Sequence, residues 1–182
     1  MQENATAVLE HKICNARAQY YEQNPKALIF KQNQKLECAA AVSQNISLDV
    51  LFKETILIVP NTNRIYLNYA IFKTFAHPLI YDQLVDYIIG LFNRCIQENG
   101  NFELNINLQS FTITAAQRYK EIARIFCNRC LARDSSYSAC LVGLHIYNCP
   151  RMVDTLANLF STFVDDTVRA KVVLHSEGFG DL

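Results

Sequence analysis

Two cysteines separated by two residues, Cys127 and Cys130, have the spacing of half a zinc site or of a redox pair. Either role needs the thiols in a loop or at the start of a helix, where a metal or a second thiol can reach them. Here they fall near the end of an amphipathic segment, close to its apolar face, and the chain has no second pair with this spacing. We therefore expect both thiols to pack in the core, and we predict no metal and no cofactor.

Histidine side chains are the next candidates for chemistry, as general bases. His77 precedes a proline, His145 lies alone in an apolar run, and His175 ends the last predicted strand. A base needs a nucleophile or an acid beside it, and the serines between residues 135 and 138 lack the G-x-S-x-G turn that exposes a nucleophile. We expect His145 to be a hydrogen-bonded core residue, and we predict that the protein is not an enzyme.

A group of cations with a single acidic neighbour, Glu121, lies on one predicted helix. An ordinary solvated helix face explains such a group, and the alternative is a patch for an anionic partner, such as a phospholipid head group or an acidic subunit. The whole chain has 17 Lys and Arg against 17 Asp and Glu, so no net charge attracts nucleic acid and we expect no nucleic-acid partner. The residues of this predicted patch are Arg118, Lys120, Arg124, Arg129 and Arg133.

Composition places the chain among folded proteins with a substantial core. It has 182 residues, of which 51% are hydrophobic, with only four Pro and five Gly. Its seven cysteines are an odd number and lie mostly in apolar segments, so we expect reduced thiols in an intracellular compartment. The longest apolar stretch, residues 79–96, contains Asp82 and Asp86, so we do not expect it to cross a membrane.

The first third of the chain predicts a helix followed by a hairpin. Apolar residues at helical spacing over 5–22 predict an N-terminal helix, and residues 26–50 give mixed signals. Residues rich in β-branched and aromatic side chains predict strands over 55–59 and 65–75, joined by an Asn-Thr-Asn turn. We expect residues 1–50 to form a helix with an irregular extension, and residues 51–182 to form one α/β domain.

The rest of the chain alternates between strand and helix patterns. We predict helices over 79–97, from Thr112 or Thr114 to 131, and over 150–164, and strands over 102–108, 139–147 and 168–175. This order gives an α/β fold with a mostly parallel sheet, in which β-α-β crossovers follow the hairpin. The run 139–147 is almost entirely apolar, which predicts an internal strand covered on both faces. Asn105 and Asn107 lie on the polar side of their strand, so we expect them to face solvent or another chain.

Three segments carry a resemblance to a known family. FELNINLQSF (102–111) resembles the strand that opens the lipid-binding unit of the CRAL-TRIO family, which includes phosphatidylinositol-transfer and retinaldehyde-binding proteins. LHIYNCP (144–150), followed by LANLFSTFV, is similar to the family's strand, Asn-x-Pro turn and Phe-rich helix. TVRAKVVL (167–174) resembles its basic last strand. The smaller STAS domains share a similar layout and are the second choice.

The resemblance implies a non-enzymatic module that binds a lipid or another hydrophobic ligand. The ligand would lie among apolar side chains of the second predicted strand and of the helices at 79–97 and 150–164. The alternatives are a structural subunit of a virion or organellar complex that has lost the ligand, with other protein subunits as partners, and a STAS-like interaction module. The predicted ligand-binding residues are Tyr69, Phe72, Leu84, Ile88, Phe92, Leu156, Phe160 and Phe163.

Overall fold

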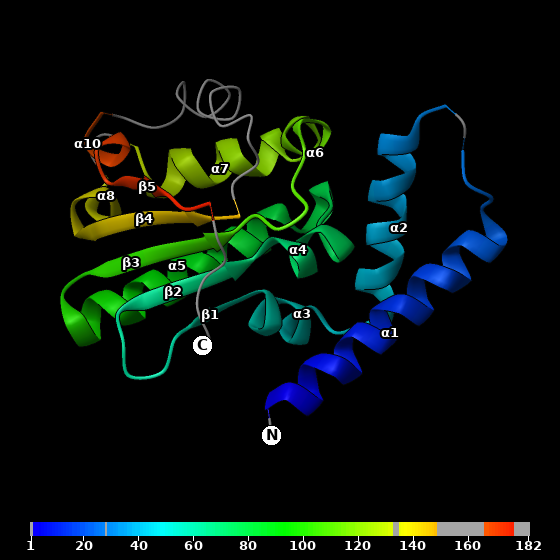
Figure 1. Cartoon of the computed structure of the whole chain (residues 1–182), viewed down its shortest axis with the longest axis horizontal. Helices are drawn as coiled ribbons and strands as arrows, with labels where there is room; N and C mark the ends of the chain where they lie inside the picture. Colours follow the sequence, from blue (N-terminus) through cyan, green and yellow to red (C-terminus); the bar gives the residue numbers. More distant parts are fainter. Residues whose placement is uncertain (1, 28, 133–134, 149–165, 177–182) are drawn as a thin grey trace.

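The chain folds around a five-stranded sheet with helices packed on one of its faces (Figure 1). The computed structural model describes residues 2–27, 29–132, 135–148 and 166–176. The strands are β1 (Ile56–Ile58), β2 (Arg64–Asn68), β3 (Phe102–Asn107), β4 (Leu141–Tyr147) and β5 (Val172–Leu174). The helices are α1 (Gln2–Gln23), α2 (Lys31–Asn45), α3 (Leu48–Thr55), α4 (Tyr69–Phe75), η1 (Pro78–Ile80), α5 (Tyr81–Asn99), α6 (Ile113–Arg118), α7 (Lys120–Cys130), α8 (Ser136–Cys140) and α10 (Asp166–Arg169).

The strands lie in the order β1-β2-β3-β4-β5, so each strand neighbours the one that precedes it in sequence. β1 and β2 form an antiparallel hairpin, and every later pair is parallel. The predicted α/β class, the parallel sheet and the opening hairpin are therefore confirmed. β4 has a strand on each side, so the prediction that it is internal is also confirmed.

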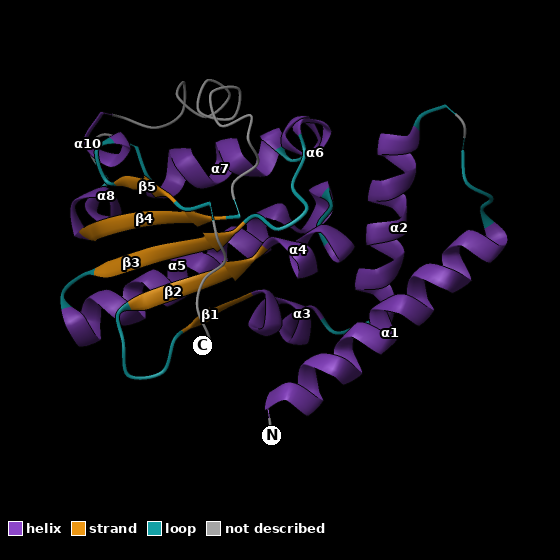
Figure 2. Ribbon diagram, in the orientation of Figure 1, coloured by secondary structure: helices purple, strands orange, loops and turns teal. Residues whose placement is uncertain are grey.

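Helices α5 and α7 cover one face of the sheet (Figure 2). α5 packs across β1, β2 and β3, and α7 packs beside α5. Leu84, Ile88 and Phe92, spaced four residues apart on α5, are all buried against this face. Phe92 stacks on Phe102 of β3 with ring centroids 4.2 Å apart. α5 ends at Gly100, which has a left-handed φ of 74° and donates its N–H to the Ile96 carbonyl.

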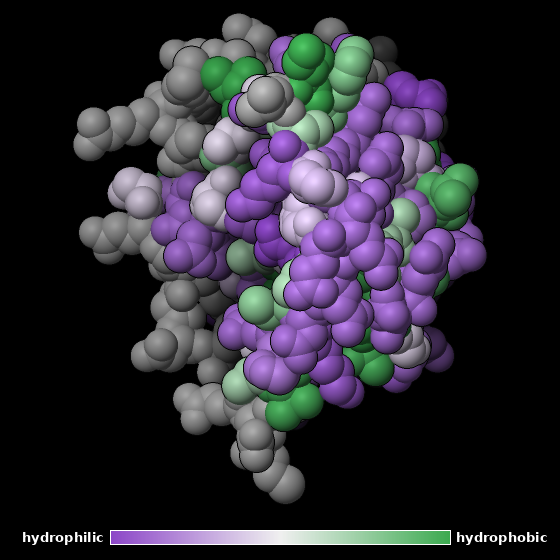
Figure 3. Space-filling view, turned by 90° about the vertical axis from the view of Figure 1, so that its right-hand side faces the viewer, coloured by the Kyte–Doolittle hydropathy of each residue, from purple (hydrophilic) through white to green (hydrophobic). Residues whose placement is uncertain are grey.

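The N-terminal helices lie at one end of the sheet (Figure 1). α1 packs on α2, and α2 packs on α4. The side of the molecule that α1 and α2 form is mostly hydrophilic, with hydrophobic side chains in separate places that include its upper edge (Figure 3). The expected helix over 5–22 is confirmed by α1. The expectation of an irregular extension before residue 50 is wrong, because α2 and the start of α3 occupy it. The proposed division of the chain at residue 50 stays a prediction.

Two predicted elements are shorter than their apolar patterns. The strand expected over 65–75 ends at Asn68, whose side-chain oxygen accepts the Ala70 N–H at 2.9 Å and so starts α4. The helix expected to reach residue 131 begins after its predicted cap, Thr112, but is interrupted at Tyr119, so it forms α6 and α7. In both places a local side-chain or backbone geometry overrides a continuous apolar pattern.

The strand expected over 139–147 begins at Leu141, because α8 extends to Cys140. The expectation that both of its faces are covered is wrong. Val142 sits at a bulge opposite β3 and is 53% exposed, and the last three residues of β4 are half-buried. The last strand is also shorter, since Val168 belongs to α10. The helix predicted over 150–164 lies outside the described residues.

Truncating Phe92 should destabilise the fold strongly. Phe92→Ala removes a fully buried ring that stacks on Phe102, so we expect the free energy of unfolding to fall by about 3–5 kcal/mol. Urea denaturation followed by circular dichroism measures this change. The matched control is Leu79→Ala, because Leu79 is 85% exposed, and it should change stability by less than about 0.5 kcal/mol. Equal effects of the two variants would contradict the packing described here.

Candidate functional site

The face of the sheet opposite α5 and α7 carries polar side chains. Cross-strand pairing places residues of β2, β3 and β4 side by side on this face, because side chains two apart along a strand point the same way. The apolar alternation of β3 that the sequence predicts is therefore confirmed, and the structure adds matching polar positions on both neighbouring strands. We call this surface the polar face, and its residues are Arg64, Tyr66, Glu103, Asn105, Asn107, His145, Tyr147 and His175.

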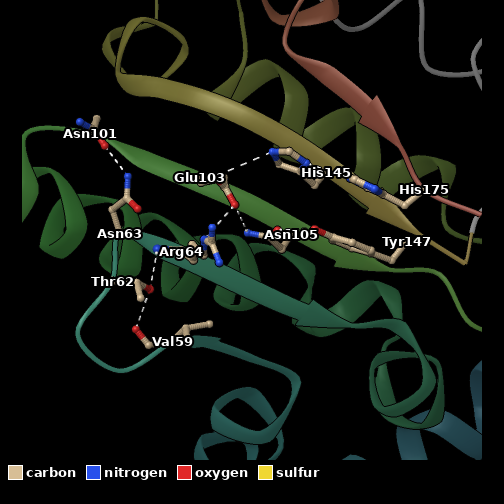
Figure 4. A network of polar contacts seen from close by, with 10 residues as sticks. All are labelled: Val59, Thr62, Asn63, Arg64, Asn101, Glu103, Asn105, His145, Tyr147 and His175. Atoms are coloured by element: carbon tan, nitrogen blue, oxygen red, sulfur yellow. Dashed lines mark hydrogen bonds and ion pairs between the residues drawn. The ribbon is translucent and has the colours of Figure 1, made fainter. Parts of the chain in front are cut away.

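Glu103 is the centre of the contacts on the polar face (Figure 4). Its Oε1 lies 3.3 Å from Nε of Arg64 and accepts a hydrogen bond from Nδ2 of Asn105 at 3.0 Å. Its Oε2 lies 3.8 Å from Nε2 of His145. Glu103 thus joins side chains from all three central strands. A carboxylate that is mostly buried needs such partners to compensate for its lost hydration.

Asn105 is fully buried beneath this network and has a partner at each end of its amide. Its Nδ2 donates to Glu103, and its Oδ1 accepts from the Tyr147 hydroxyl at 3.2 Å. Asn107 donates to the Tyr66 hydroxyl at 2.9 Å. The expectation that these two asparagines face solvent or another chain is therefore wrong for Asn105, whose amide is satisfied within the sheet.

Three aromatic rings lie nearly parallel on the polar face. His145 Nδ1 and His175 Nε2 are 3.0 Å apart, so one nitrogen donates to the other. Tyr147 stacks on His175 with centroids 4.3 Å apart and planes inclined by 8°. Burial raises the pKa of Tyr147, and the neighbouring Glu103 adds to that shift, so the hydroxyl is protonated at neutral pH. The prediction that His145 is hydrogen-bonded is confirmed, although it is only half-buried.

Gly143 makes the position of His145 possible. A Cβ at residue 143 would lie 2.8 Å from Nε2 of His145, and it would be in ordinary van der Waals contact with Cγ of Glu103, at 3.5 Å. Real Cβ atoms do not approach other atoms as closely as 2.8 Å, so any larger residue would push the imidazole away from its position beside the carboxylate. The glycine therefore leaves the space in which the histidine and the glutamate meet.

A second polar feature lies at the amino ends of β2 and β3, and it shares Arg64 with the polar face. An open hollow of about 620 Å³ is lined by Asn61, Thr62, Asn63, Arg64, Asn99 and Asn101. Asn63 donates to Asn101 across it, and Thr62 accepts the Arg64 N–H at 3.1 Å (Figure 4). The polar face also extends through Tyr147 and His175 to the carboxyl ends of β4 and β5, the end at which parallel α/β sheets bind ligands. We therefore take the polar face as the candidate site.

The other residues with possible chemistry are structural. Cys127 and Cys130 are buried, and burial raises the pKa of Cys127 to about 11 and that of Cys130 to about 12, so both are neutral thiols. The prediction that they pack in the core is confirmed. Among the described residues, no group of three or more His, Cys, Asp or Glu is arranged to hold a metal ion. His77 is buried, with a ring nitrogen 2.9 Å from the Ser43 hydroxyl.

The five residues of the predicted anionic-partner patch do not share one environment. Arg129 forms an ion pair with Asp86 at 2.6 Å, and Arg118 donates to the Gln32 side chain at 2.7 Å. Lys120 and Arg124 are exposed on α7, and Arg133 lies outside the described residues. Their binding to an anionic partner stays a prediction.

The predicted ligand-binding residues that the structure describes lie in the core. Tyr69 and Phe72 pack on Tyr119 beside α6, and Phe92 packs on Phe102. Leu84 and Ile88 complete the buried face of α5. Leu156, Phe160 and Phe163 lie outside the described residues. Contact of this set with a ligand stays a prediction.

Sequence reasoning missed Arg64, Glu103 and Gly143 as parts of a site. The available signal was the matching alternation of β3 and β4, in which Glu103 and Asn105 fall opposite Gly143 and His145. Reading β4 as uniformly apolar hid this alternation, because Gly143 and Tyr147 can both stand in an apolar run. The contribution of Arg64 depends on the register between β2 and β3, which the sequence does not give.

Enlarging Gly143 should disrupt the polar face. In Gly143→Ala the new methyl group displaces the His145 ring, so we expect its contact with Glu103 to break and the free energy of unfolding to fall by about 1 kcal/mol. NMR of the imidazole nitrogens and urea denaturation measure the two effects. The control is Gly90→Ala in α5, where a Cβ meets nothing within 4 Å and where alanine should stabilise the helix by up to about 1 kcal/mol. An unchanged His145 spectrum in Gly143→Ala would contradict this role.

From the burial of the thiols we expect the folded protein to become less stable at high pH. The native state keeps Cys127 protonated up to about pH 11, whereas an unfolded thiol ionises near 9.0. The native state therefore binds more protons in this interval, and the free energy of unfolding should fall as pH rises through it. Cys127→Ala should reduce this fall.

The burial of these thiols can also be tested by chemical labelling. In the native protein a maleimide should modify the exposed Cys14 and spare Cys127 and Cys130. Rapid labelling of all three would contradict the burial of Cys127 and Cys130.

Comparison with known proteins agrees with this architecture. A family model described as CRAL/TRIO domain matches residues 61–181. Among solved structures, the chain is similar to the one titled "Crystal structure of Sfh5", with a TM-score of 0.56 and 17% identity, over 97% of this chain and 68% of that one. Such low identity shows a shared fold alone. No curated protein sequence matches the chain. In the part of the chain that the structure describes, no helix is long and apolar enough to cross a membrane.

The matched region contains the whole parallel part of the sheet, from β2 to β5, together with the polar face that its strands carry. It extends over more than half of the chain. The sequence suggested a resemblance to the CRAL-TRIO family and, as second choice, to STAS domains, and this match supports the first. The chain belongs to the CRAL/TRIO domain family.

Proposed function

We propose that this protein binds a hydrophobic ligand such as a lipid, without changing it chemically, and that the polar face receives the ligand's polar group. Membership of the CRAL/TRIO family supports a lipid-binding module. The contacts around Glu103 support the placement of the ligand's polar group on the polar face of the sheet.

The observation that carries the proposal is the asymmetry of the sheet. A parallel sheet is ordinarily buried and apolar on both faces. Here the face against α5 is apolar, whereas the other presents a carboxylate, an amide, two imidazoles and a phenol within hydrogen-bonding reach of one another. In such a site an apolar chain would be held by hydrophobic contact while the polar group exchanges hydrogen bonds with Glu103 or the histidines.

The thiols and the serine hydroxyl described here are buried or hydrogen-bonded to the backbone, which fits a role in binding without catalysis. The thiols of Cys127 and Cys130 are buried and neutral, and the Ser138 hydroxyl donates to the Ser135 carbonyl at 2.8 Å. None of these groups contacts the His145–Glu103 pair. The histidines therefore act here as hydrogen-bonding groups.

The core residues predicted from the sequence give an alternative location for the ligand. A ligand between α5 and the sheet would have to separate rings already in contact, such as Phe92 and Phe102. A ligand on the polar face needs no such rearrangement of the described core. Protein partners, and membership of a virion or organellar complex, stay predictions from the sequence.

The proposal is tested by the ligand that the purified protein carries. We expect solvent extraction followed by mass spectrometry to recover a lipid or another amphipathic molecule. Glu103→Gln removes the charge and keeps the shape, so the affinity for that molecule should fall about tenfold or more. The matched control is Glu98→Gln, which removes an exposed carboxylate of α5 and should leave the affinity unchanged. A protein that carries no ligand and takes none up from vesicles would instead favour the scaffold alternative.

A further inference from the structure

The loop between α1 and α2 lies at the edge of the molecule (Figure 1), and it carries two exposed hydrophobic residues. Ile29 is 72% exposed and Phe30 is 77% exposed. We call these two residues the apolar tip. Phe30 also has a left-handed backbone, with φ of 61°, which is uncommon for an aromatic residue. In this conformation the ring of Phe30 lies in solvent. Packing within the described chain therefore does not explain why Phe30 adopts a left-handed backbone.

The loop behind the apolar tip is held in place by Gln34. Its Oε1 accepts the Ala27 N–H at 2.8 Å, and its Nε2 donates to the Asn24 and Pro25 carbonyls at 3.3 and 2.9 Å. The backbone N–H of Gln34 also donates to the Phe30 carbonyl. The side chain of Gln34 thus ties the first part of the loop to α2, and its backbone N–H holds the carbonyl of Phe30. The loop is therefore hydrogen-bonded to α2 both before the tip and at Phe30 itself.

Cations flank the apolar tip in sequence and continue along α2. Lys26 and Lys31 flank the tip in sequence, and the ammonium of Lys26 lies 5.9 Å from the centre of the Tyr21 ring. Arg118 reaches the same surface from α6, through its hydrogen bond to Gln32 of α2. We call the whole set the basic rim, and its members are Arg17, Lys26, Lys31, Lys35, Lys73 and Arg118.

Electrostatic effects connect the members of the basic rim other than Lys26. Burial lowers the pKa of Lys35, and Arg118, Lys31 and Arg17 lower it further. Burial likewise lowers the pKa of Lys73, with Arg17 and Lys35 adding to the shift. Every charged neighbour that contributes to these two shifts is another cation. Four elements, α1, α2, α4 and α6, therefore bring like charges together.

Within the described residues, no carboxylate forms an ion pair with a member of the basic rim. The ion pairs of other exposed cations show that counter-ions are used elsewhere, as between Arg129 and Asp86 or Arg94 and Glu98. Like charges held together repel one another, and this repulsion is relieved when an anion binds. The basic rim is therefore suited to an anionic partner.

We infer that the apolar tip and the basic rim dock the protein on an anionic phospholipid bilayer. Ile29 and Phe30 would enter the boundary between head groups and acyl chains, while the lysines and arginines contact lipid phosphates. A soluble phosphate would use the cations and leave the tip in water. A nucleic acid would likewise bind the cations through its phosphates and leave the tip in water. The combination of exposed apolar side chains with cations that form no ion pair among the described residues fits a membrane surface best.

Docking of this kind is separate from the proposed ligand site. The polar face lies on the sheet, whereas the basic rim lies on helices that flank it (Figure 1). A protein that holds no lipid can still dock, and one that cannot dock can still hold a lipid. The two proposals therefore fail in different experiments.

Vesicle co-sedimentation of the full chain tests the inference. We expect binding to vesicles of phosphatidylcholine mixed with phosphatidylserine, much weaker binding to phosphatidylcholine alone, and a loss of binding as salt is raised. The double variant Lys31→Gln, Lys35→Gln removes two exposed cations of the rim. At about fivefold per lysine, its partition onto anionic vesicles should fall about 25-fold.

The apolar contribution is tested separately by Phe30→Asn. Asparagine accepts a left-handed backbone, so this variant keeps the loop conformation and removes the ring. Its partition should fall on the order of tenfold, with the salt dependence retained. Circular dichroism and thermal melting establish that each variant is folded.

Matched controls remove the same chemistry elsewhere on the surface. Lys53→Gln with Arg94→Gln takes two exposed cations from α3 and α5, and Leu79→Ser takes an exposed apolar side chain from η1. Both should bind vesicles as the unmodified protein does. The inference is overturned if the unmodified protein ignores anionic vesicles, or if the variant of Lys53 and Arg94 loses as much binding as the rim variant. It is also overturned if binding needs the lysines but not Phe30 and is matched by single-stranded RNA.

Discussion

Glu103 and Asn105 carry a charge and an amide into the middle strand of the sheet, and the arrangement of the polar face follows from the need to satisfy them. A buried polar group without a partner costs several times what a hydrogen bond contributes. Arg64, Tyr147 and His145 supply the partners, one strand away on either side. The register of three strands is thereby linked to the side chains of one face, since a slip of one residue would turn Glu103 towards α5.

The same alternation produces the hydrophobic core. Phe102 and Leu104 point towards α5, where Leu84, Ile88 and Phe92 pack on them. One short strand thus separates an apolar interior from a polar surface. Gly143 lies on the polar side of β4, where its missing side chain leaves space for the ring of His145.

The helices at the α1–α2 end show a different balance of forces. The core there is made by α1 packing on α2 and α2 packing on α4, and the outward surface collects cations from four elements. On α5 and α7, by contrast, the cations Arg94 and Arg129 form ion pairs with Glu98 and Asp86. The cations at the α1–α2 end form no such ion pair among the described residues, and Ile29 and Phe30 are exposed at the same end. These two features together support the inferred docking of this end on a membrane.

Much of the fold was determined by the sequence alone, since local patterns specify it. The period of α5, the alternation of β3 and the turn between β1 and β2 depend on residues a few positions apart. The boundaries at Asn68 and Tyr119 did not follow from these patterns, because a single cap or backbone angle sets them. The polar face and the basic rim were decided by the tertiary structure. Glu103 and His145 are far apart in sequence and come together through the register of the strands. Arg17 and Lys35 are likewise brought near one another by the packing of the helices.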